Sequence, residues 1–179
     1  RSYQLGDWGD SERFWELREK RQAEVVLVLQ RPTGWLILQT KSFYPPGVYR
    51  IPTGGIKEGE DLLAAVQRET WEETGLVAQS ARFLGVLRYR FRRSGWPLER
   101  VSYVFLLQVG FGQPQAQDET EEITAFREIP AEGLGAVIDL LEALTGEWAL
   151  WGQFRALAHR FVAEQMGAVH TAYSVQRIT

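Results

Sequence analysis

The stretch that decides the fold is GGIKEGEDLLAAVQRETWEETGL, which runs from Gly54 to Leu76. It opens with a glycine turn, continues with a helical pattern and ends on Gly75, a residue type common at helix C-caps. Glu72 and Glu73 follow Glu69 by three and four residues, so the three carboxylates share one helical face. Like charges at this spacing repel one another. The pattern therefore predicts a cation among them.

Length and composition favour one globular domain. The chain has 179 residues, of which 45% are hydrophobic, enough for a sizeable core, and we expect residues 1–179 to form a single domain. The formal net charge of −3 gives no reason to expect a protein that coats a polyanion. No internal repeat or low-complexity linker divides the chain.

The absence of cysteine bounds both chemistry and compartment. Neither disulfides nor thiolate metal sites are available, which fits a reducing compartment, and we expect a cytoplasmic protein. No apolar run reaches the length of a membrane span, so no membrane partner is expected. The first ten residues also lack the charged-then-apolar order of a signal peptide.

Before the glycine turn, the sequence predicts a helix or turn followed by a hairpin. A capped helix or turn is predicted from Asp10 to about residue 21. The continuous apolar run AEVVLVLQ at 23–30 predicts a strand buried on both faces. Turn residues follow at 31–34, then a returning strand at 35–39. Residues 41–50 contain two prolines and a glycine, so they are predicted to form a loop.

The segment after Leu76 alternates strands, loops and helices. The alternation at residues 83–91 predicts a strand with one apolar face and one basic face. The apolar face contains Phe83, Gly85, Leu87, Tyr89 and Phe91. The basic face contains Arg88, Arg90 and Arg92. A turn at 94–97, a strand at 100–109, an acidic loop at 112–122 and a strand at 123–129 follow. Helices are predicted at 130–144 and 147–165. The Trp148–Phe161 stripe of the last helix is most simply core, with a homodimer interface as the alternative.

The carboxylates of the 54–76 stretch suggest a hard metal ion. With no cysteine and only two histidines, oxygen ligands suit Mg²⁺ or Mn²⁺ better than zinc or copper. Mg²⁺ commonly sits between a few carboxylates, water and substrate phosphates, so phosphate-ester or pyrophosphate chemistry follows. Taken alone, however, glutamates on a helix usually form a solvated face.

The spacing of these residues resembles the Nudix box. Gly54 is followed in register by Glu60, Arg68-Glu69, Glu72-Glu73, Gly75 and Leu76. Seven charged or glycine positions, each matching about one time in fifteen, coincide at random about once in 10⁸ starting points. Thr70 stands where the family usually has an aliphatic residue, and Thr53 where many members have glycine. The resemblance implies an α/β fold, a Nudix-type α/β/α sandwich with a mixed sheet and here an extra C-terminal helix.

The resemblance also assigns roles within the box. It implies that Glu69 and Glu73 bind Mg²⁺ or Mn²⁺, together with the carbonyl of Thr53. Glu72 becomes a third ligand or a partner in water activation. Arg68 holds and orients carboxylates of the box, including Glu60.

Residues outside the box are expected to complete the site. Many members add a catalytic or metal-binding glutamate from a later loop, and the acidic segment 118–122 makes Glu119 the first choice and Glu121 the second. A solvated loop is the alternative there. Arg50, Arg88 and Arg90 are the candidate substrate-binding residues. Arginines on such a strand more often face water.

The implied activity is Mg²⁺-dependent hydrolysis of a pyrophosphate bond in a nucleoside diphosphate derivative, of nucleotide-sugar, dinucleotide or NTP type. Capped or triphosphorylated RNA ends are further substrates that the resemblance allows. The alternative is a catalytically silent Nudix-fold module that senses a nucleotide. Modules of that kind usually lose box carboxylates, and this box keeps all of them, which favours the enzyme.

Overall fold

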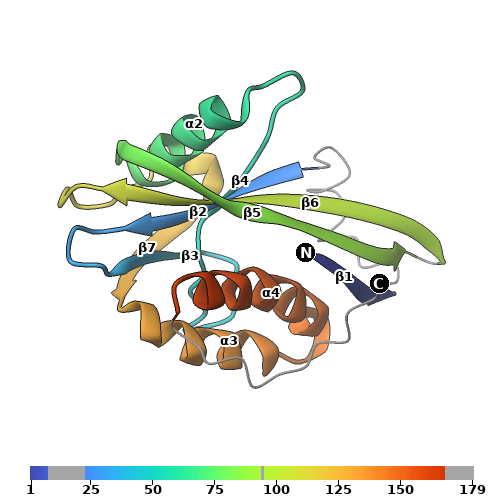
Figure 1. The fold of residues 1–179 in the computed structure, drawn as a ribbon. Coiled ribbons are helices and arrows are strands. Elements are labelled where there is room, and N and C mark those ends of the chain that lie inside the picture. The colour runs from blue at the N-terminus through green and yellow to red at the C-terminus, as the bar shows by residue number, and fades with distance from the viewer. Residues whose placement is uncertain (8–22, 94, 168–179) are drawn as a thin grey trace.

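The computed structural model describes residues 1–7, 23–93 and 95–167, and a mixed sheet forms its middle layer (Figure 1). The helix or turn expected from Asp10 lies outside the described residues. The strands are β1 (Ser2–Asp7), β2 (Ala23–Gln30), β3 (Leu36–Lys41), β4 (Thr53–Gly55), β5 (Ala78–Arg93), β6 (Trp96–Val109) and β7 (Ile123–Ile129). The α-helices are α2 (Leu62–Thr74), α3 (Leu134–Glu142) and α4 (Ala149–Gln165). Short 3₁₀ turns, η1 (Glu119–Glu121), η2 (Ala131–Gly133) and η3 (Gly146–Trp148), precede β7, α3 and α4.

The sheet runs in the order β1-β5-β6-β2-β3-β7, with β4 paired to β2 outside this path. β2 is parallel to β6 and antiparallel to β3 and β4. On its second side β2 meets β4 near Ala23 and β3 near Gln30. The mixed sheet with helices on both faces confirms the predicted α/β/α sandwich, and the last helix is present.

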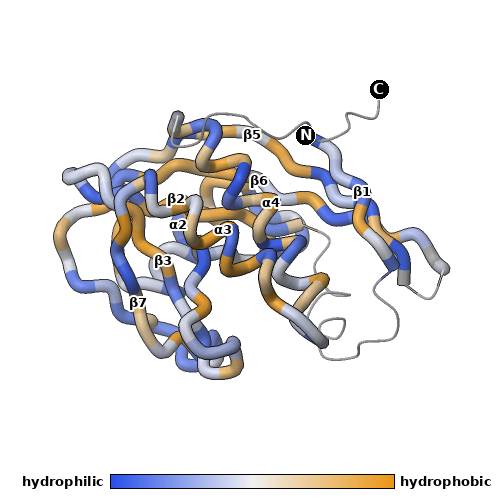
Figure 2. Tube along the Cα trace, turned by 90° about the horizontal axis from the view of Figure 1, so that it is seen from below, coloured by the Kyte–Doolittle hydropathy of each residue, from blue (hydrophilic) through white to orange (hydrophobic). Residues whose placement is uncertain are grey.

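β2 divides the core into two parts, because successive side chains of a strand point to opposite faces. Val26 and Val28 belong to the larger cluster under α3 and α4, whereas Val25, Leu27 and Leu29 belong to the smaller cluster under α2. All five are at most 1% exposed, so the prediction of a strand buried on both faces is confirmed. Figure 2 shows this apolar interior as the orange centre of the trace.

The helix predicted from the 54–76 stretch is α2, and its ends are set by local chemistry. The Asp61 carboxylate accepts hydrogen bonds from the Leu63 and Ala64 amides, and Gly75 ends the helix in the left-handed conformation at φ 64°. Thr70, at the position that departs from the box pattern, is fully buried and donates to the Val66 carbonyl (2.6 Å). The helix accordingly packs with Thr70 in place of an aliphatic residue.

β5 differs from its predicted alternation at one residue. Phe83 is 51% exposed and contacts the ring of Phe105 on the α2 side, because a bulge between Phe83 and Gly85 shifts the alternation by one residue. Beyond the bulge the prediction holds, with Leu87, Tyr89 and Phe91 buried and Arg88, Arg90 and Arg92 exposed. The turn is shorter than expected, since β6 begins at Trp96.

β1 was not predicted. It pairs in parallel with β5, with Tyr3 opposite Tyr89 and their rings stacked at 5.8 Å. Trp151, Phe154 and Phe161 of the α4 stripe belong to the core, because they are at most 5% exposed. Within the described residues, no helix is both long and apolar enough to cross a membrane.

His159 of α4 links the last helix to the segment just before the box. Its Nε2 accepts a hydrogen bond from the Ile51 amide (3.0 Å), so Nδ1 carries the proton and donates to the Arg155 carbonyl (2.8 Å). Burial lowers the pKa of His159 to about 4, and the positive charges of Arg50 and Arg155 add to this effect. The imidazole is therefore neutral in the folded protein at neutral pH.

We expect the free energy of unfolding to fall as the pH decreases from about 6.5 to about 4. In that window the unfolded chain binds a proton at His159 and the folded chain does not, so the folded state loses roughly 3 kcal/mol. His159→Gln keeps an acceptor near the Ile51 amide and removes the titration. Urea denaturation at a series of pH values should give a shallower pH dependence for this variant. Equal slopes for the two proteins would contradict the assignment.

Candidate metal centre

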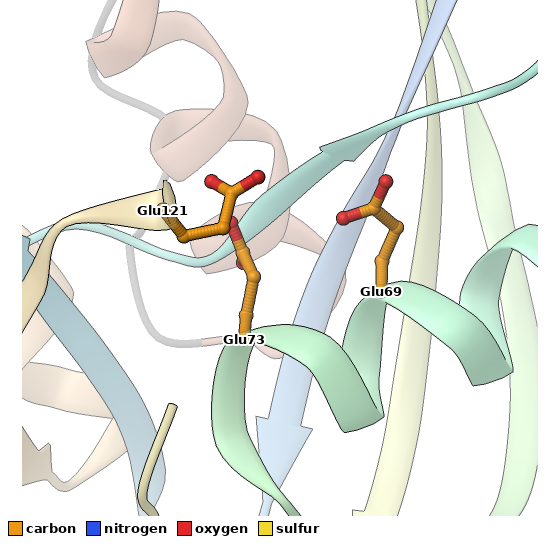
Figure 3. A group of neighbouring side chains, drawn as sticks. All are labelled: Glu69, Glu73 and Glu121. Carbon is orange, nitrogen blue, oxygen red and sulfur yellow. The ribbon is translucent and has the colours of Figure 1, made fainter. Parts of the chain in front are cut away.

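Three carboxylates converge above the face of β4. Glu69 and Glu73 rise from α2, and Glu121 comes from η1 just before β7 (Figure 3). One oxygen from each lies within 4.8 Å of the other two. Glu69 and Glu73 are buried and Glu121 is half-buried. Such a group of oxygen donors is suited to a hard divalent cation.

Glu73 is the most unusual member of this group. Its carboxylate is 0% exposed, and neither oxygen has a hydrogen-bond partner. Burial raises the pKa of Glu73 to about 7, and the nearby positive charges of Lys41 and Arg50 oppose this only in part. A buried carboxylate without hydrogen bonds is costly unless a proton or a cation compensates it. The orphaned oxygens of Glu73 thus suit this residue to binding a metal ion.

Arg68 organises the other side of the group. Its guanidinium donates to both oxygens of Glu60 (2.7 and 2.8 Å), to Glu69 (2.7 Å), to Glu72 (2.8 Å) and to the Gly55 carbonyl (2.9 Å). These bonds hold the pKa of Glu60 down, to about 2. Burial raises the pKa of Glu69, with Arg68 opposing. The predicted bonds from Arg68 to the box carboxylates, including Glu60, are present.

Gly54 allows α2 to approach β4 closely. A Cβ atom at this position would lie 2.0 Å from Glu69 Cδ and 2.2 Å from its Oε2. Thr53 precedes it, and its hydroxyl accepts from Arg50 Nη1 (3.0 Å). The glycine therefore creates the space that the Glu69 carboxylate occupies, next to the Thr53 main chain.

The loop that carries Glu121 is attached to the end of α2. The Gln117 and Asp118 amides donate to the Glu72 carbonyl (2.8 and 3.1 Å), and the Gln115 amide donates to the Thr74 carbonyl (2.8 Å). These are carbonyls of the last helical turn, which lack partners inside a helix. The main chain of the loop thus caps α2 and is fixed beside the carboxylates.

Of the two loop glutamates, the structure brings Glu121 and not Glu119 to the group. Asp118 caps η1 by accepting from the Thr120 amide, and the turn directs Glu121 inward while Glu119 is exposed. Glu119 instead lines a pocket of about 690 Å³ between the 113–118 segment and β7, to which none of the three converging carboxylates contributes. The structure therefore places the second choice from the sequence, Glu121, beside Glu69 and Glu73, and its role in the site stays a prediction.

Lys41 is the residue that the sequence analysis missed. Its Nζ lies 2.5 Å from Glu121 Oε2 and 3.9 Å from Glu73 Oε1, and its side chain is only 10% exposed. It ends β3, which pairs with β7. The only sign of its role in the sequence was a lysine near the end of a predicted strand. Glu121 lies about 80 residues further along the chain, so sequence patterns do not show that the two residues meet.

Arg50, a predicted substrate-binding residue, is buried in the protein. It is 3% exposed, and its guanidinium donates to the Tyr44 hydroxyl (2.7 Å), the Ile51 carbonyl (2.8 Å) and Thr53 Oγ1 (3.0 Å). These bonds run from Nε and Nη1 and connect Arg50 with Tyr44, Ile51 and Thr53. It is a positioning residue for the main chain at Thr53.

Arg88 and Arg90 of β5 face water, and neither belongs to the carboxylate group. Arg90 forms an exposed ion pair with Glu99 across the hairpin (2.8 Å). Exposed pairs of this kind contribute little to stability. Glu72 is also outside the group of three, although Arg68 holds it beside Glu69, and its side chain is 32% exposed.

Comparisons with known proteins agree with this geometry. The chain is 30% identical over 112 residues to the NAD-capped RNA hydrolase NudC of Chromobacterium violaceum, covering 62% of this chain and 40% of the relative. It is 30% identical over 99 residues to an ADP-ribose pyrophosphatase of Methanocaldococcus jannaschii, covering 55% of this chain and 57% of the relative. The matches thus span less than two thirds of either relative.

The fold has a solved counterpart. A crystal structure of a MutT NUDIX hydrolase from Burkholderia pseudomallei superposes with a TM-score of 0.55 and 22% identity, over 81% of this chain and 97% of that one. At this identity the likeness concerns the fold alone. Residues 20–151, more than half of the chain, match the NUDIX domain. The chain therefore belongs to the Nudix hydrolase family.

Proposed function

We propose that the protein hydrolyses a pyrophosphate bond in a nucleoside diphosphate derivative and depends on Mg²⁺ or Mn²⁺. The observation that carries the proposal is the pair of buried Glu73 oxygens, which have no hydrogen-bond partner and lie beside Glu69 and Glu121. The names of the relatives, a pyrophosphatase of ADP-ribose and a hydrolase of NAD-capped RNA, support this reaction class. The substrate is accordingly of nucleotide-sugar, dinucleotide or NTP type, with capped RNA ends as a further possibility to test.

Glu69, Glu73 and Glu121 would hold the ion, with the Thr53 carbonyl as a main-chain ligand. When bound, a divalent ion neutralises the charge of a diphosphate and makes its phosphorus easier to attack. Arg68 keeps Glu69 and Glu72 in place through hydrogen bonds of 2.7 and 2.8 Å. A carboxylate that is already fixed in place loses little conformational entropy when it binds a metal ion or accepts a proton.

Glu72 is the candidate general base of this proposal. Its side chain is partly open to solvent, and Arg68 fixes one of its oxygens. In the reaction, the oxygen of water bonds to phosphorus, the bond from phosphorus to the bridging oxygen breaks, and the water's proton passes to the carboxylate. The bridging oxygen leaves with the second phosphorylated product.

Replacing Glu73 with glutamine should abolish most of the activity. Glutamine keeps the volume but supplies a weaker neutral ligand, so we expect turnover to fall about a hundredfold or more. A panel of nucleotide sugars, dinucleotides, NTPs and NAD-capped RNA, with Mg²⁺ or with a chelator, measures this. Glu58→Gln, an exposed residue of the same box, is the matched control. Hydrolysis that ignored both the chelator and Glu73→Gln would refute the mechanism, whereas tight nucleotide binding without turnover would favour the sensor.

Gly54→Ala should impair the site without unfolding the protein. The new Cβ would overlap the Glu69 carboxylate, which must then rotate out of its position beside Glu73. We expect at least a hundredfold loss of turnover and weaker Mn²⁺ binding, with the circular dichroism spectrum unchanged. Gly135→Ala, where a Cβ meets nothing within 4 Å, is the control. Normal metal binding by Gly54→Ala would show that Glu69 is not a ligand.

A further inference from the structure

The feature that the proposed mechanism leaves unused is Lys41. Its ammonium group lies among the same carboxylates that would hold the ion, 2.5 Å from Glu121 and 3.9 Å from Glu73. Among the described residues, no other ammonium or guanidinium nitrogen lies within 4 Å of a Glu73 or Glu121 carboxylate oxygen. The guanidinium of Arg68 faces Glu60, Glu69 and Glu72 instead.

The position of Lys41 is fixed by the main chain. The pairing of β3 with β7 extends as far as Lys41, which lies opposite Ile123, and has an irregularity between Thr40 and Lys41. The next residue, Ser42, donates from its amide to the Glu122 carbonyl (2.9 Å) and from its hydroxyl to the Glu122 carboxylate (3.0 Å). The end of β3 is thus bonded to the residues that follow Glu121, next to the Lys41–Glu121 pair. The main chain therefore places Lys41 within reach of Glu121.

The charges at this point explain why a cation is needed there. Glu69, Glu73 and Glu121 bring three carboxylates together in a largely buried space, and the Glu73 oxygens accept no hydrogen bond. Without a compensating positive charge, the three carboxylates would repel one another, and their burial would cost solvation free energy. The Lys41 ammonium offsets part of this charge in the protein without metal.

A divalent ion held by the same three carboxylates must come close to the Lys41 ammonium. Two positive charges a few Å apart in a partly buried site repel strongly, because the effective dielectric constant there is well below that of water. The ion must therefore displace Nζ from Glu121 or bind against its charge. Either way, Lys41 opposes the metal.

We propose that Lys41 is the resident counter-cation of the Glu73–Glu121 pair and that the divalent ion binds in competition with it. The inference rests on the proposed function, since it takes Glu69, Glu73 and Glu121 as the metal ligands. Its consequence is a site that stays folded without metal and binds the ion less tightly than three carboxylates alone would do.

The test measures metal binding without substrate. Lys41→Met removes the charge and keeps an unbranched chain, so calorimetric titration with Mn²⁺ should give a dissociation constant at least tenfold lower than that of the parent protein. In the absence of metal, the same variant should melt at a lower temperature. Lys41→Arg keeps the charge and should stay within about threefold of the parent affinity. Lys57→Met is the matched control for net charge, because Lys57 is exposed and outside the carboxylate group.

The outcomes separate this inference from the proposed function. Unchanged or weaker Mn²⁺ binding by Lys41→Met, while the parent protein binds Mn²⁺ through Glu73, would overturn the competition and leave the proposed function intact. If the parent protein binds no metal and Glu73→Gln changes nothing, the proposed function fails first.

Should Lys41→Met not fold without metal, Lys41→Gln provides the second variant, and folding is then followed by circular dichroism against Mn²⁺ concentration. Recovery of the fold by metal supports the competition. Failure of both variants to recover contradicts it.

Discussion

The hydrogen bonds of Arg68 are the interaction on which the arrangement of the site depends. Its guanidinium bonds to Glu60 and the Gly55 carbonyl in the loop before α2. The same group bonds to Glu69 and Glu72 on the face of the helix and so connects the loop with the helix. A planar guanidinium with five donors is suited to this role, and an ammonium is not. Without it, the loop and the helix would present their carboxylates independently, and like charges would drive them apart.

The remaining carboxylates meet through the topology of the sheet. β4 lies beside β2 and supports α2, which carries Glu69 and Glu73, whereas the pairing of β3 with β7 brings Glu121. Two distant parts of the chain thus contribute to one group. The fold supplies the favourable energy, largely through two apolar clusters on the faces of β2, that keeps these charges together. The group thus concentrates unfavourable electrostatics at the point where we propose that a cation binds.

The sequence predicted what local patterns determine. The helix from 62 to 74 was predictable because its cap residues and box spacing lie within one segment. β2 was predictable because five consecutive apolar residues, three of them valine, are typical of a strand covered on both sides. Phe83 was placed on the wrong face because a β-bulge breaks the alternation without a signature in composition. The choice between Glu119 and Glu121 depended on the 3₁₀ turn, and the burial of Arg50 on its contacts with Tyr44 and Thr53. Lys41 was missed because only long-range strand pairing brings it to Glu121.

The attachment of the 115–118 segment to α2 has a consequence for how the protein tolerates change. The bonds run from main-chain amides of the loop to main-chain carbonyls of the helix, so they do not depend on which side chains the loop carries. Proline in place of residue 115, 117 or 118 would remove a donor, but most other substitutions there leave the cap intact. The side chains of residues 115–118 can therefore be redesigned to bind new ligands. The main-chain bonds of this segment still hold Glu121 in its position.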